Sequence, residues 1–372
     1  MKKTVMLLTA LCICFHLFTL PLCAAPSVSA KSAVVIDAKT GTILFEQDAH
    51  TRRGMASTTK IMTALVTLER LDERTVVEVD PRACGIEGSS VYLSPGEKIS
   101  VETLLYALML QSANDAAAAL AYAVAGGIGE FAALMNEKAD ELGLLATHFE
   151  NPHGLDGETH YTTAYELALI SAAALENERF ATIVSTEKKA VPLHNGTATR
   201  LLVNHNRLLR EYDDIIGVKT GFTKKCGRTL VSAAEKSGVR LICVTLNDPD
   251  DWDDHRQLLD YAFSLYEEVS LAGSGDFSYG VPVCGGTDSS VTVRNTSALS
   301  VMLPRDRGEI RMVTELPRFL YAGVQEGDAV GQVVFYADGQ RLGAVTLYAE
   351  RSVAIQRQEK GFWRKLFPFL LK

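Results

Sequence analysis

Ser57 and Lys60 stand three residues apart in the stretch MASTTK, and their types and spacing suit nucleophilic chemistry. On a helix this spacing puts both side chains on one face, one turn apart. A serine hydroxyl is a weak nucleophile until a base takes its proton, and a lysine can be that base if burial or nearby cations lower its pKa. A second S-x-x-K pair, Ser185 and Lys188, has charged neighbours typical of a solvated segment, so we interpret it as structural.

Two further motifs follow the first one in a specific order. Ser112-Ala-Asn114 comes next, and Lys219-Thr220-Gly221 follows on a predicted strand. An S-x-x-K serine motif combined with S-x-N and K-T-G motifs is typical of class A β-lactamases and penicillin-binding proteins. Each motif alone is common, whereas three in this order and in these contexts are specific.

The first two motifs supply the predicted catalytic groups. Ser57 would attack an acyl carbonyl, Lys60 would take the serine proton, and Ser112 would pass a proton to the departing amine. Asn114 has an amide that can hold a carbonyl of a peptide substrate. Lys60 and Lys219 are expected to lie near one another. Because a positive charge on one amine disfavours protonation of the other, the pKa of one lysine should be lowered.

The third motif supplies predicted substrate contacts. Lys219 and Thr220 can hold a carboxylate, and Gly221 lets a substrate backbone approach closely. The backbone N–H groups of Ser57 and Phe222 are the expected oxyanion hole, in which each donor is typically worth about 3 to 4 kcal/mol in the transition state.

Longer segments around the motifs resemble the low-molecular-mass penicillin-binding proteins, the serine D-alanyl-D-alanine carboxypeptidases of peptidase family S11. The resemblance is close over residues 31–270 and looser beyond them. It is carried by RRGMASTTKIMTAL, GSSVYLSPGEKISVETLLYALMLQSANDAAAALA, NPHGLDGETHYTTAYELA, NHNRLL and GVKTGFTKKCGRTLVSAA.

The resemblance implies a fold and an activity. The implied fold is α+β, a penicillin-recognising, serine β-lactamase-like domain with an antiparallel sheet and a helical subdomain, followed by a small all-β domain. The implied activity is removal of the terminal D-alanine from peptidoglycan pentapeptide stems through an acyl-enzyme on Ser57, in cell-wall maturation. β-Lactam antibiotics would bind covalently, and no metal or organic cofactor is implied.

Three residues depart from the usual pattern of this family. Met55 stands where proline is usual, which changes the entry to the Ser57 helix but removes no catalytic group. Ala113 stands where many members have glycine, and it should be tolerated unless that backbone needs a positive φ. His205, in NHNRLL, stands at a variable position and receives no role.

The spacing of apolar residues predicts the elements that must position these groups. Residues 32–49 predict two short strands around a turn made by Lys39-Thr40-Gly41, a second K-T-G sequence. Strands joined by short turns, as predicted after residue 215, must be antiparallel. Helices are predicted in 56–71, 100–127 with a break at 111–115, 130–143, 163–175 and 255–269, and strands in 215–223, 228–235 and 239–247.

We divide the chain into four parts: a signal peptide (1–30), a catalytic domain (31–270), a β-rich domain (275–355) and an amphipathic tail (357–372). The β-rich domain is predicted from alternating apolar and polar residues, with Asp338-Gly339 turning one hairpin. The tail holds five basic residues, one acidic residue and several aromatics, a composition that suits the interface of a membrane. A terminal helix docked on the β-rich domain is the alternative.

The N-terminal residues predict secretion, because two lysines precede an apolar run that ends in small residues. VSA, ending at Ala30, resembles a cleavage site, and an uncleaved anchor helix is the alternative. The protein is therefore expected outside the cytoplasm, associated with the cytoplasmic membrane through its tail. The formal net charge of −8 argues against a nucleic-acid partner.

Histidine, cysteine and arginine residues outside the three motifs are further candidates for a functional role. His153, His160 and His205 lack the motifs of a histidine-based hydrolase, so loop or packing roles are favoured. Cys226 is interpreted as a packing residue more than a redox-sensitive thiol, and Arg228 is a candidate carboxylate partner on charge alone. The scattered cysteines indicate neither a disulfide framework nor a metal site.

Three alternative functions remain open at this point. A serine β-lactamase shares the motifs, but neither Glu150 nor Glu158 stands in a context resembling its deacylation loop. A D,D-endopeptidase would use the same acyl donor and cut cross-links. A non-catalytic wall-binding module would leave the serine and lysine set unexplained.

The two K-T-G sequences generate an asymmetric prediction. Lys219→Ala should cripple acylation by penicillin, because Lys219 is expected to face the substrate. Lys39→Ala should leave acylation almost unchanged, because Lys39 belongs to a turn. Covalent labelling with a fluorescent penicillin measures both rates, and an equal loss in the two variants would contradict the assignment.

Overall fold

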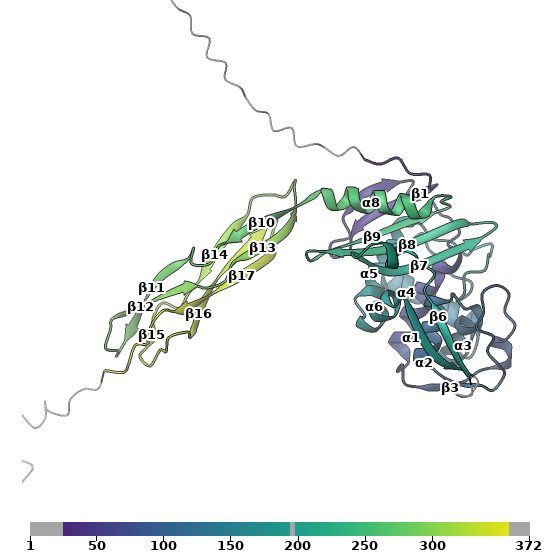
Figure 1. Cartoon of the computed structure of the whole chain (residues 1–372), viewed down its shortest axis with the longest axis horizontal. Helices are drawn as coiled ribbons and strands as arrows, with labels where there is room; N and C mark the ends of the chain where they lie inside the picture. Colours follow the sequence, from purple (N-terminus) through teal and green to yellow (C-terminus); the bar gives the residue numbers. More distant parts are fainter. Residues whose placement is uncertain (1–24, 194–197, 357–372) are drawn as a thin grey trace, which may run out of the picture.

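The computed structural model describes residues 25–193 and 198–356. It has two lobes, an α+β lobe and an elongated β lobe that extends away from it (Figure 1). An antiparallel sheet with a helical part, followed by a small all-β unit, is the predicted fold class, which is thereby confirmed.

A five-stranded antiparallel sheet forms the centre of the α+β lobe, in the order β2-β1-β9-β8-β7. The turn between β8 and β9 has positive φ at Ser237 and Gly238, as a tight hairpin requires. The strands are β1 (Ser32–Asp37), β2 (Ile43–Gln47), β7 (Ile215–Thr223), β8 (Gly227–Lys236) and β9 (Val239–Leu246).

Both faces of this sheet are covered, because successive side chains of a strand point to opposite faces. Val34 of β1 packs in the large core under the helices, whereas Val35 packs in a smaller core with Leu258 of α8. The helices of this lobe are α1 (Lys60–Arg70), α2 (Val101–Leu110), α3 (Asn114–Ala125), α4 (Ile128–Glu141), α5 (Ala164–Leu175), α6 (Glu178–Ser185), α7 (Leu208–Glu211) and α8 (Asp251–Ser264).

Short elements complete the lobe. The hairpin β5 (Lys188–Leu193) and β6 (Ala198–Val203) was not predicted from the sequence, and neither was the pair β3 (Val76–Glu78) and β4 (Lys98–Ser100). Two 3-10 turns, η1 (Ala56–Thr59) and η2 (Pro81–Ala83), precede α1 and α2 in the chain.

One helix boundary differs from the prediction. The helix expected over residues 255–269 ends at Ser264, and β10 (Tyr266–Ala272) begins almost at once. Buried and exposed residues alternate along β10, and this strand pairs with β13. Strand pairing therefore overrides the helical pattern of the last residues. The Tyr266 hydroxyl donates to Asp37 Oδ2 (2.7 Å), which links β10 to the end of β1.

The β lobe has a six-stranded sheet in the order β14-β16-β17-β12-β11-β15 and a two-stranded sheet of β10 and β13. Asp338 and Gly339 both have positive φ between β16 and β17, which confirms the predicted hairpin turn. The strands are β11 (Ser278–Cys284), β12 (Ser290–Asn295), β13 (Leu299–Pro304), β14 (Arg311–Glu315), β15 (Leu320–Tyr321), β16 (Ala329–Ala337) and β17 (Gln340–Ala349).

The predicted tail lies outside the described residues, as does most of the predicted signal peptide. In the ranges that the structure covers, no single helix has both the length and the hydropathy to cross a membrane. The bent pair of α3 and α4 passes that test on length and composition only.

The segment before Lys31 is held by two acidic residues. The Ser29 amide donates to Asp254 Oδ2 (2.6 Å), and the Ser29 hydroxyl lies 2.9 Å from both Asp248 Oδ1 and Asp254 Oδ2. Asp248 and Asp254 are buried, and burial raises the pKa of Asp248 to about 6. Ser29 therefore supplies donors to carboxylates that water reaches poorly.

A chain that begins at Lys31, as cleavage after VSA predicts, lacks these donors. We expect it to be less stable than a chain that begins at Ala25 by about 1 to 2 kcal/mol, because buried carboxylates lose hydrogen bonds. Denaturant unfolding of the two chains measures the difference. Ser29→Ala in the longer chain should reproduce part of the loss, whereas Ser27→Ala, at an exposed position, should not. Equal stability of all four chains would contradict the role of Ser29.

Candidate active site

Ser57 lies on η1, which runs directly into α1. The preceding residue, Ala56, has a φ of 49°, a left-handed value that costs energy for alanine. Two hydroxyl groups hold the backbone here: Thr58 Oγ1 donates to the Met55 carbonyl oxygen (2.6 Å), and Thr229 Oγ1 of β8 donates to the same oxygen (3.1 Å). The nucleophile candidate is thus fixed between a buried helix and the sheet.

Lys60 is completely buried, and its amine is surrounded by oxygen atoms. Lys60 Nζ lies 3.0 Å from Ser57 Oγ, 2.7 Å from Asn114 Oδ1 and in hydrogen-bond contact with the His153 carbonyl oxygen. Burial, with a smaller contribution from Lys219, holds the pKa of Lys60 well below its usual range. A neutral amine can donate its two hydrogens to the two carbonyl-type oxygens, which only accept, and direct its lone pair at the Ser57 hydroxyl.

Ser112 and Asn114 lie where α2 ends and α3 begins. The positive φ of this turn falls on Ser112 (59°), whereas Ala113 has a φ of −65°, so alanine is tolerated there as predicted. Ser112 Oγ is buried and has no hydrogen-bond partner among the described residues. A buried hydroxyl without a partner is available to a bound substrate or to a neighbouring lysine.

The Asn114 side chain is positioned by the loop that precedes β4. Asn114 Oδ1 accepts from Lys60, and Nδ2 donates to the Glu87 carbonyl oxygen (2.5 Å). Gly88 has a φ of 95°, and a Cβ there would lie 2.8 Å from Asn114 Nδ2. One hydrogen of Nδ2 remains for the substrate carbonyl that the sequence predicts.

Asp115 ties the same loop to α3. Its carboxylate is buried and accepts from Ser90 Oγ (2.6 Å), the Val91 amide (3.2 Å) and the Leu93 amide (3.0 Å). These hydrogen bonds hold the loop against the helix whose first residue is Asn114. Sequence reasoning missed Asp115, although an acidic residue next to an amide at a predicted helix start is a recognisable signal.

Lys219, Thr220, Gly221 and Phe222 occupy β7, at one edge of the sheet. Lys219 is 1% exposed, its Nζ donates to the Thr220 carbonyl oxygen (2.8 Å), and burial lowers its pKa to about 7. Thr220 is half-buried, and the Phe222 side chain is 65% exposed. β7 therefore places a buried amine on the edge strand of the sheet.

Two glycines bring other segments against the Ser57 backbone. A Cβ on Gly221 would lie 2.9 Å from the Ser57 nitrogen, so β7 approaches the nucleophile as closely as a backbone can. Gly154 has a φ of 88°, and a Cβ there would collide with the Ala56 carbonyl oxygen. Glycine is required at both places by contact, and at Gly154 also by φ.

The loop that contains Gly154 is a larger part of the site than the sequence indicated. NPHGL was predicted only to shape a turn nearby. Asn151 Oδ1 accepts from the Gly154 amide (2.7 Å), the Pro152 carbonyl accepts from Thr63 Oγ1 (2.6 Å), and the His153 carbonyl accepts from Lys60. A backbone carbonyl carries no sequence signal, so its role could not be predicted.

His153 and His160 are buried near the site, whereas His205 is exposed. His160 Nε2 lies 2.8 Å from Thr59 Oγ1, and its Nδ1 accepts from the Glu150 amide (3.0 Å). Burial lowers the pKa of His160 to about 4 and that of His153 to about 3. Partial burial, and then Lys219, also lower the pKa of His205.

Glu150 and Glu158 are the glutamates that were compared with the deacylation residue of a β-lactamase, and neither bonds to the Lys60 amine. The Glu150 carboxylate accepts from both the amide and the hydroxyl of Thr159, and these hydrogen bonds lower its pKa. Glu158 is exposed. The hydrogen-bond partners of Lys60 are therefore a serine, an asparagine and a carbonyl, and neither glutamate is among them.

Cys226 and Arg228 are engaged with acidic residues. Cys226 is buried, burial raises its pKa, and its Sγ lies 3.1 Å from Asp156 Oδ1. Arg228 Nη2 forms an ion pair with Asp251 Oδ1 (2.7 Å), and its guanidinium lies over the Trp252 ring. Arg228 thus has a carboxylate partner within the protein, and a substrate carboxylate would compete for it.

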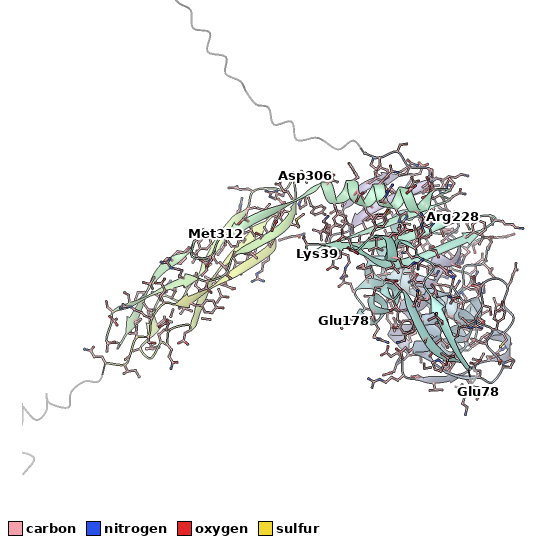
Figure 2. The ribbon with its side chains drawn as sticks, viewed as in Figure 1. Lys39, Glu78, Glu178, Arg228, Asp306 and Met312 are labelled. Atoms are coloured by element: carbon pink, nitrogen blue, oxygen red, sulfur yellow. The ribbon has the colours of Figure 1, made fainter. Side chains whose placement is uncertain are left out.

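The first K-T-G sequence, residues 39–41, lies away from the candidate active-site residues. Lys39 is exposed in the turn between β1 and β2, where the Lys39 and Thr40 amides donate to Asp37 Oδ1. Gly41 has a φ of 71°, as the turn requires. Figure 2 shows Lys39 and Arg228 at opposite ends of the sheet, and Arg228 is the strand partner of Phe222. The turn role predicted for Lys39 is confirmed.

Within residues 25–193 and 198–356, no group of three or more histidine, cysteine, aspartate or glutamate side chains could hold a metal ion. The four cysteines in these ranges are free.

The buried Lys219 predicts a pH-dependent stability. Its pKa is about 7 in the folded chain, below its ordinary value of 10.5, so the unfolded chain binds more protons between these two pH values and stability rises with pH there. Below about pH 7 the full cost of burying a protonated amine is present. Lys219→Met should therefore raise the unfolding temperature at pH 6, and the gain should shrink by pH 9.5.

Thermal unfolding at the two pH values measures this effect. Lys39→Met, at an exposed turn, is the matched control and should give the same small change at both. A gain for Lys219→Met that does not depend on pH would contradict a protonation cost. A loss at both values would mean that the hydrogen bond to Thr220 outweighs it.

Comparisons with known proteins agree with this geometry. A family model described as D-alanyl-D-alanine carboxypeptidase matches residues 22–250, and one described as penicillin-binding protein 5, C-terminal domain, matches residues 266–354. The D-alanyl-D-alanine carboxypeptidase DacF of Bacillus subtilis is 31% identical over 353 residues, 90% of each chain. DacB2 of Mycobacterium tuberculosis is 35% identical over 254 residues, 66% of this chain and 86% of the relative.

A solved structure matches this chain over most of its length. Penicillin-binding protein 5 from Haemophilus influenzae has a TM-score of 0.62 and 27% identity, over 88% of this chain and 98% of that one. The family matches to both lobes, the order of the motifs and the pairing of Ser57 with the buried Lys60 lead to one conclusion: the chain belongs to the D-alanyl-D-alanine carboxypeptidase family.

Proposed function

We propose that this chain is a serine carboxypeptidase that removes the terminal D-alanine from peptidoglycan stem peptides, with Ser57 as nucleophile and Lys60 as base. The observation that carries the assignment is the 3.0 Å separation of Lys60 Nζ and Ser57 Oγ, with the lysine pKa lowered by burial. A base whose pKa is close to the working pH can take the proton as the bond to carbon forms.

Acylation follows from these contacts. Ser57 Oγ bonds to the carbonyl carbon of the penultimate D-alanine, and its proton passes to Lys60 Nζ. The C–N bond to the terminal D-alanine breaks, and the leaving nitrogen receives a proton through Ser112, whose buried hydroxyl has no other partner in the described chain. Water then attacks the ester, again with Lys60 as base, and frees Ser57.

Charge that develops on the carbonyl oxygen needs donors. The close approach of β7 to Ser57, where a Cβ on Gly221 would lie 2.9 Å from the Ser57 nitrogen, supports the Ser57 and Phe222 N–H groups as these donors. Each is worth about 3 to 4 kcal/mol in the transition state. β7 is the edge strand of the sheet, and an edge strand can pair with an extended peptide.

The terminal carboxylate of the substrate is assigned to Lys219 and Thr220. Lys219 Nζ uses one hydrogen on the Thr220 carbonyl, which leaves others for an incoming anion. A carboxylate nearby raises a lysine pKa, so substrate binding favours the protonated form of a group whose pKa is about 7 in the free protein. Asn114 holds the peptide carbonyl with its remaining amide hydrogen.

β-Lactam antibiotics acylate the same serine in this proposal. Among the described residues, neither glutamate considered for rapid deacylation is within hydrogen-bond reach of Lys60. The adduct should therefore be long-lived. Rapid multiple turnover of penicillin would favour a β-lactamase instead.

We also propose that the protein is secreted and held at the outer surface of the cytoplasmic membrane by residues 357–372. Support comes from composition alone: five basic residues against one acidic, interleaved with phenylalanine, tryptophan and leucine. Such a segment binds the interface of an anionic bilayer through buried apolar area and through charge.

Ser57→Ala tests the catalytic assignment. It should abolish penicillin labelling and lower the peptidase rate by about 10⁴-fold or more, as loss of a nucleophile does in serine hydrolases. Ser185→Ala, in the exposed second S-x-x-K pair, should retain full activity.

Mass analysis of muropeptides identifies the product of the reaction. Loss of one alanine from pentapeptide monomers supports the carboxypeptidase, whereas monomers released from dimers would identify an endopeptidase.

A further inference from the structure

Strand β15 lies at the end of the β lobe farthest from the α+β lobe (Figure 1). We call residues 283–287, 316–324 and 353–356 the distal tip. Tyr321 is 76% exposed, Ile355 66% and Phe319 46%. Three of the five large apolar side chains that are exposed on the described part of this lobe gather at this end, which indicates a contact surface.

The tip is a folded platform. β15 pairs in parallel with the end of β11, with Val283 opposite Leu320 and Cys284 opposite Tyr321. The Phe319 and Tyr321 rings meet edge to face, with centroids 5.4 Å apart.

Residues 353–356 close this platform from the other side. Gly286 bridges to Ile355 and Val324 to Val353, and Val353 is completely buried. The three exposed side chains are therefore held on paired backbone segments, above buried neighbours.

Charge at the tip contrasts with the rest of the chain. The formal net charge of the protein is −8, yet the three segments of the tip contain no aspartate or glutamate, and their single charged residue is Arg318. Three acidic residues lie just outside the segments: Asp288, which is paired with Arg351 (3.5 Å), and Glu315 and Glu326, which flank the second segment. The segments themselves place no carboxylate against an anionic surface.

The position of the chain end identifies the occupant. Gln356, the last described residue, donates its amide to the Gly285 carbonyl oxygen (2.9 Å), so the chain leaves the β lobe from the tip itself. The next sixteen residues, 357–372, are the basic and aromatic tail. Because residue 357 directly follows Gln356 in the chain, a surface that the tail binds must lie next to the tip.

We propose that the distal tip is a second membrane-contacting surface, whose Phe319, Tyr321 and Ile355 enter the headgroup region of the anionic bilayer that the tail binds. The inference rests on the proposed tail attachment and goes beyond it. Tyrosine favours this region because its ring is apolar and its hydroxyl is polar, and Phe319 and Ile355 add apolar area. Two adjacent contacts bind together more tightly than either alone, and they also fix the direction in which the β lobe stands.

Vesicle flotation tests the tip in the full mature chain. The probe is a vesicle of phosphatidylglycerol and phosphatidylethanolamine. The double variant Phe319→Ser with Tyr321→Ser should lower the partition coefficient by about 10-fold, because two interfacial aromatic contacts are lost. The matched control is Met312→Ser with Val313→Ser on β14, which are 51% and 47% exposed on the same lobe (Figure 2 labels Met312). The control should bind as the wild type does.

A label at Cys284 reports the tip directly. Cys284 is exposed and is the strand partner of Tyr321, whereas Cys226 and Cys243 are buried, and Cys84→Ser removes the half-buried thiol. An environment-sensitive fluorophore on Cys284 should shift to shorter wavelength with vesicles. The same fluorophore on Met312→Cys, in a chain with Cys284→Ser, should stay as in water.

The outcomes separate the two proposals. If the wild type floats while the tip variant partitions equally and the Cys284 label stays in water, the tip proposal is overturned and the tail alone binds. If the wild type does not float, both membrane proposals fail. Trp363→Ser with Phe367→Ser should weaken binding through the tail. Hydrolysis of a soluble D-Ala-D-Ala peptide should be unchanged in every variant, so loss of the proposed catalysis would be seen separately.

Discussion

The structure of the α+β lobe depends on one buried amine. Lys60 Nζ meets Ser57 Oγ, Asn114 Oδ1 and the His153 carbonyl, three oxygens from three segments that are far apart in the sequence. An uncompensated ammonium ion in this environment would cost several kcal/mol, so the fold lowers the lysine pKa and satisfies the amine with acceptors. The same arrangement that makes the amine tolerable inside the protein makes it a base.

Backbone strain and close approach hold these segments together. Ala56 and Ser112 take left-handed φ values that cost energy, and they do so beside the nucleophile and beside Asn114. Gly154 and Gly221 press against the backbone on either side of Ser57 from a loop and from an edge strand. Buried helices and a sheet covered on both faces supply the packing that maintains this geometry.

Much of this could be predicted from the sequence. The strands around Lys39, the helices on both sides of residues 111–115 and the late antiparallel strands follow from apolar spacing and turn residues, and the structure has them. The hairpin of β5 and β6 was missed because lysines, a proline and an arginine interrupt the apolar residues of its two strands. The end of α8 was misplaced because pairing with β13 is a contact that no local pattern encodes.

By itself, the sequence determined which residues carry the chemistry, because the order of three motifs separates Lys219 from Lys39 and Ser57 from Ser185. Tertiary structure decided how that chemistry is held. The His153 carbonyl, the carboxylate of Asp115 and the exposed tip at Tyr321 become recognisable only when distant segments meet. The sequence specifies which side chain stands at each position. Burial, which is a property of the folded chain, lowers the pKa of Lys60.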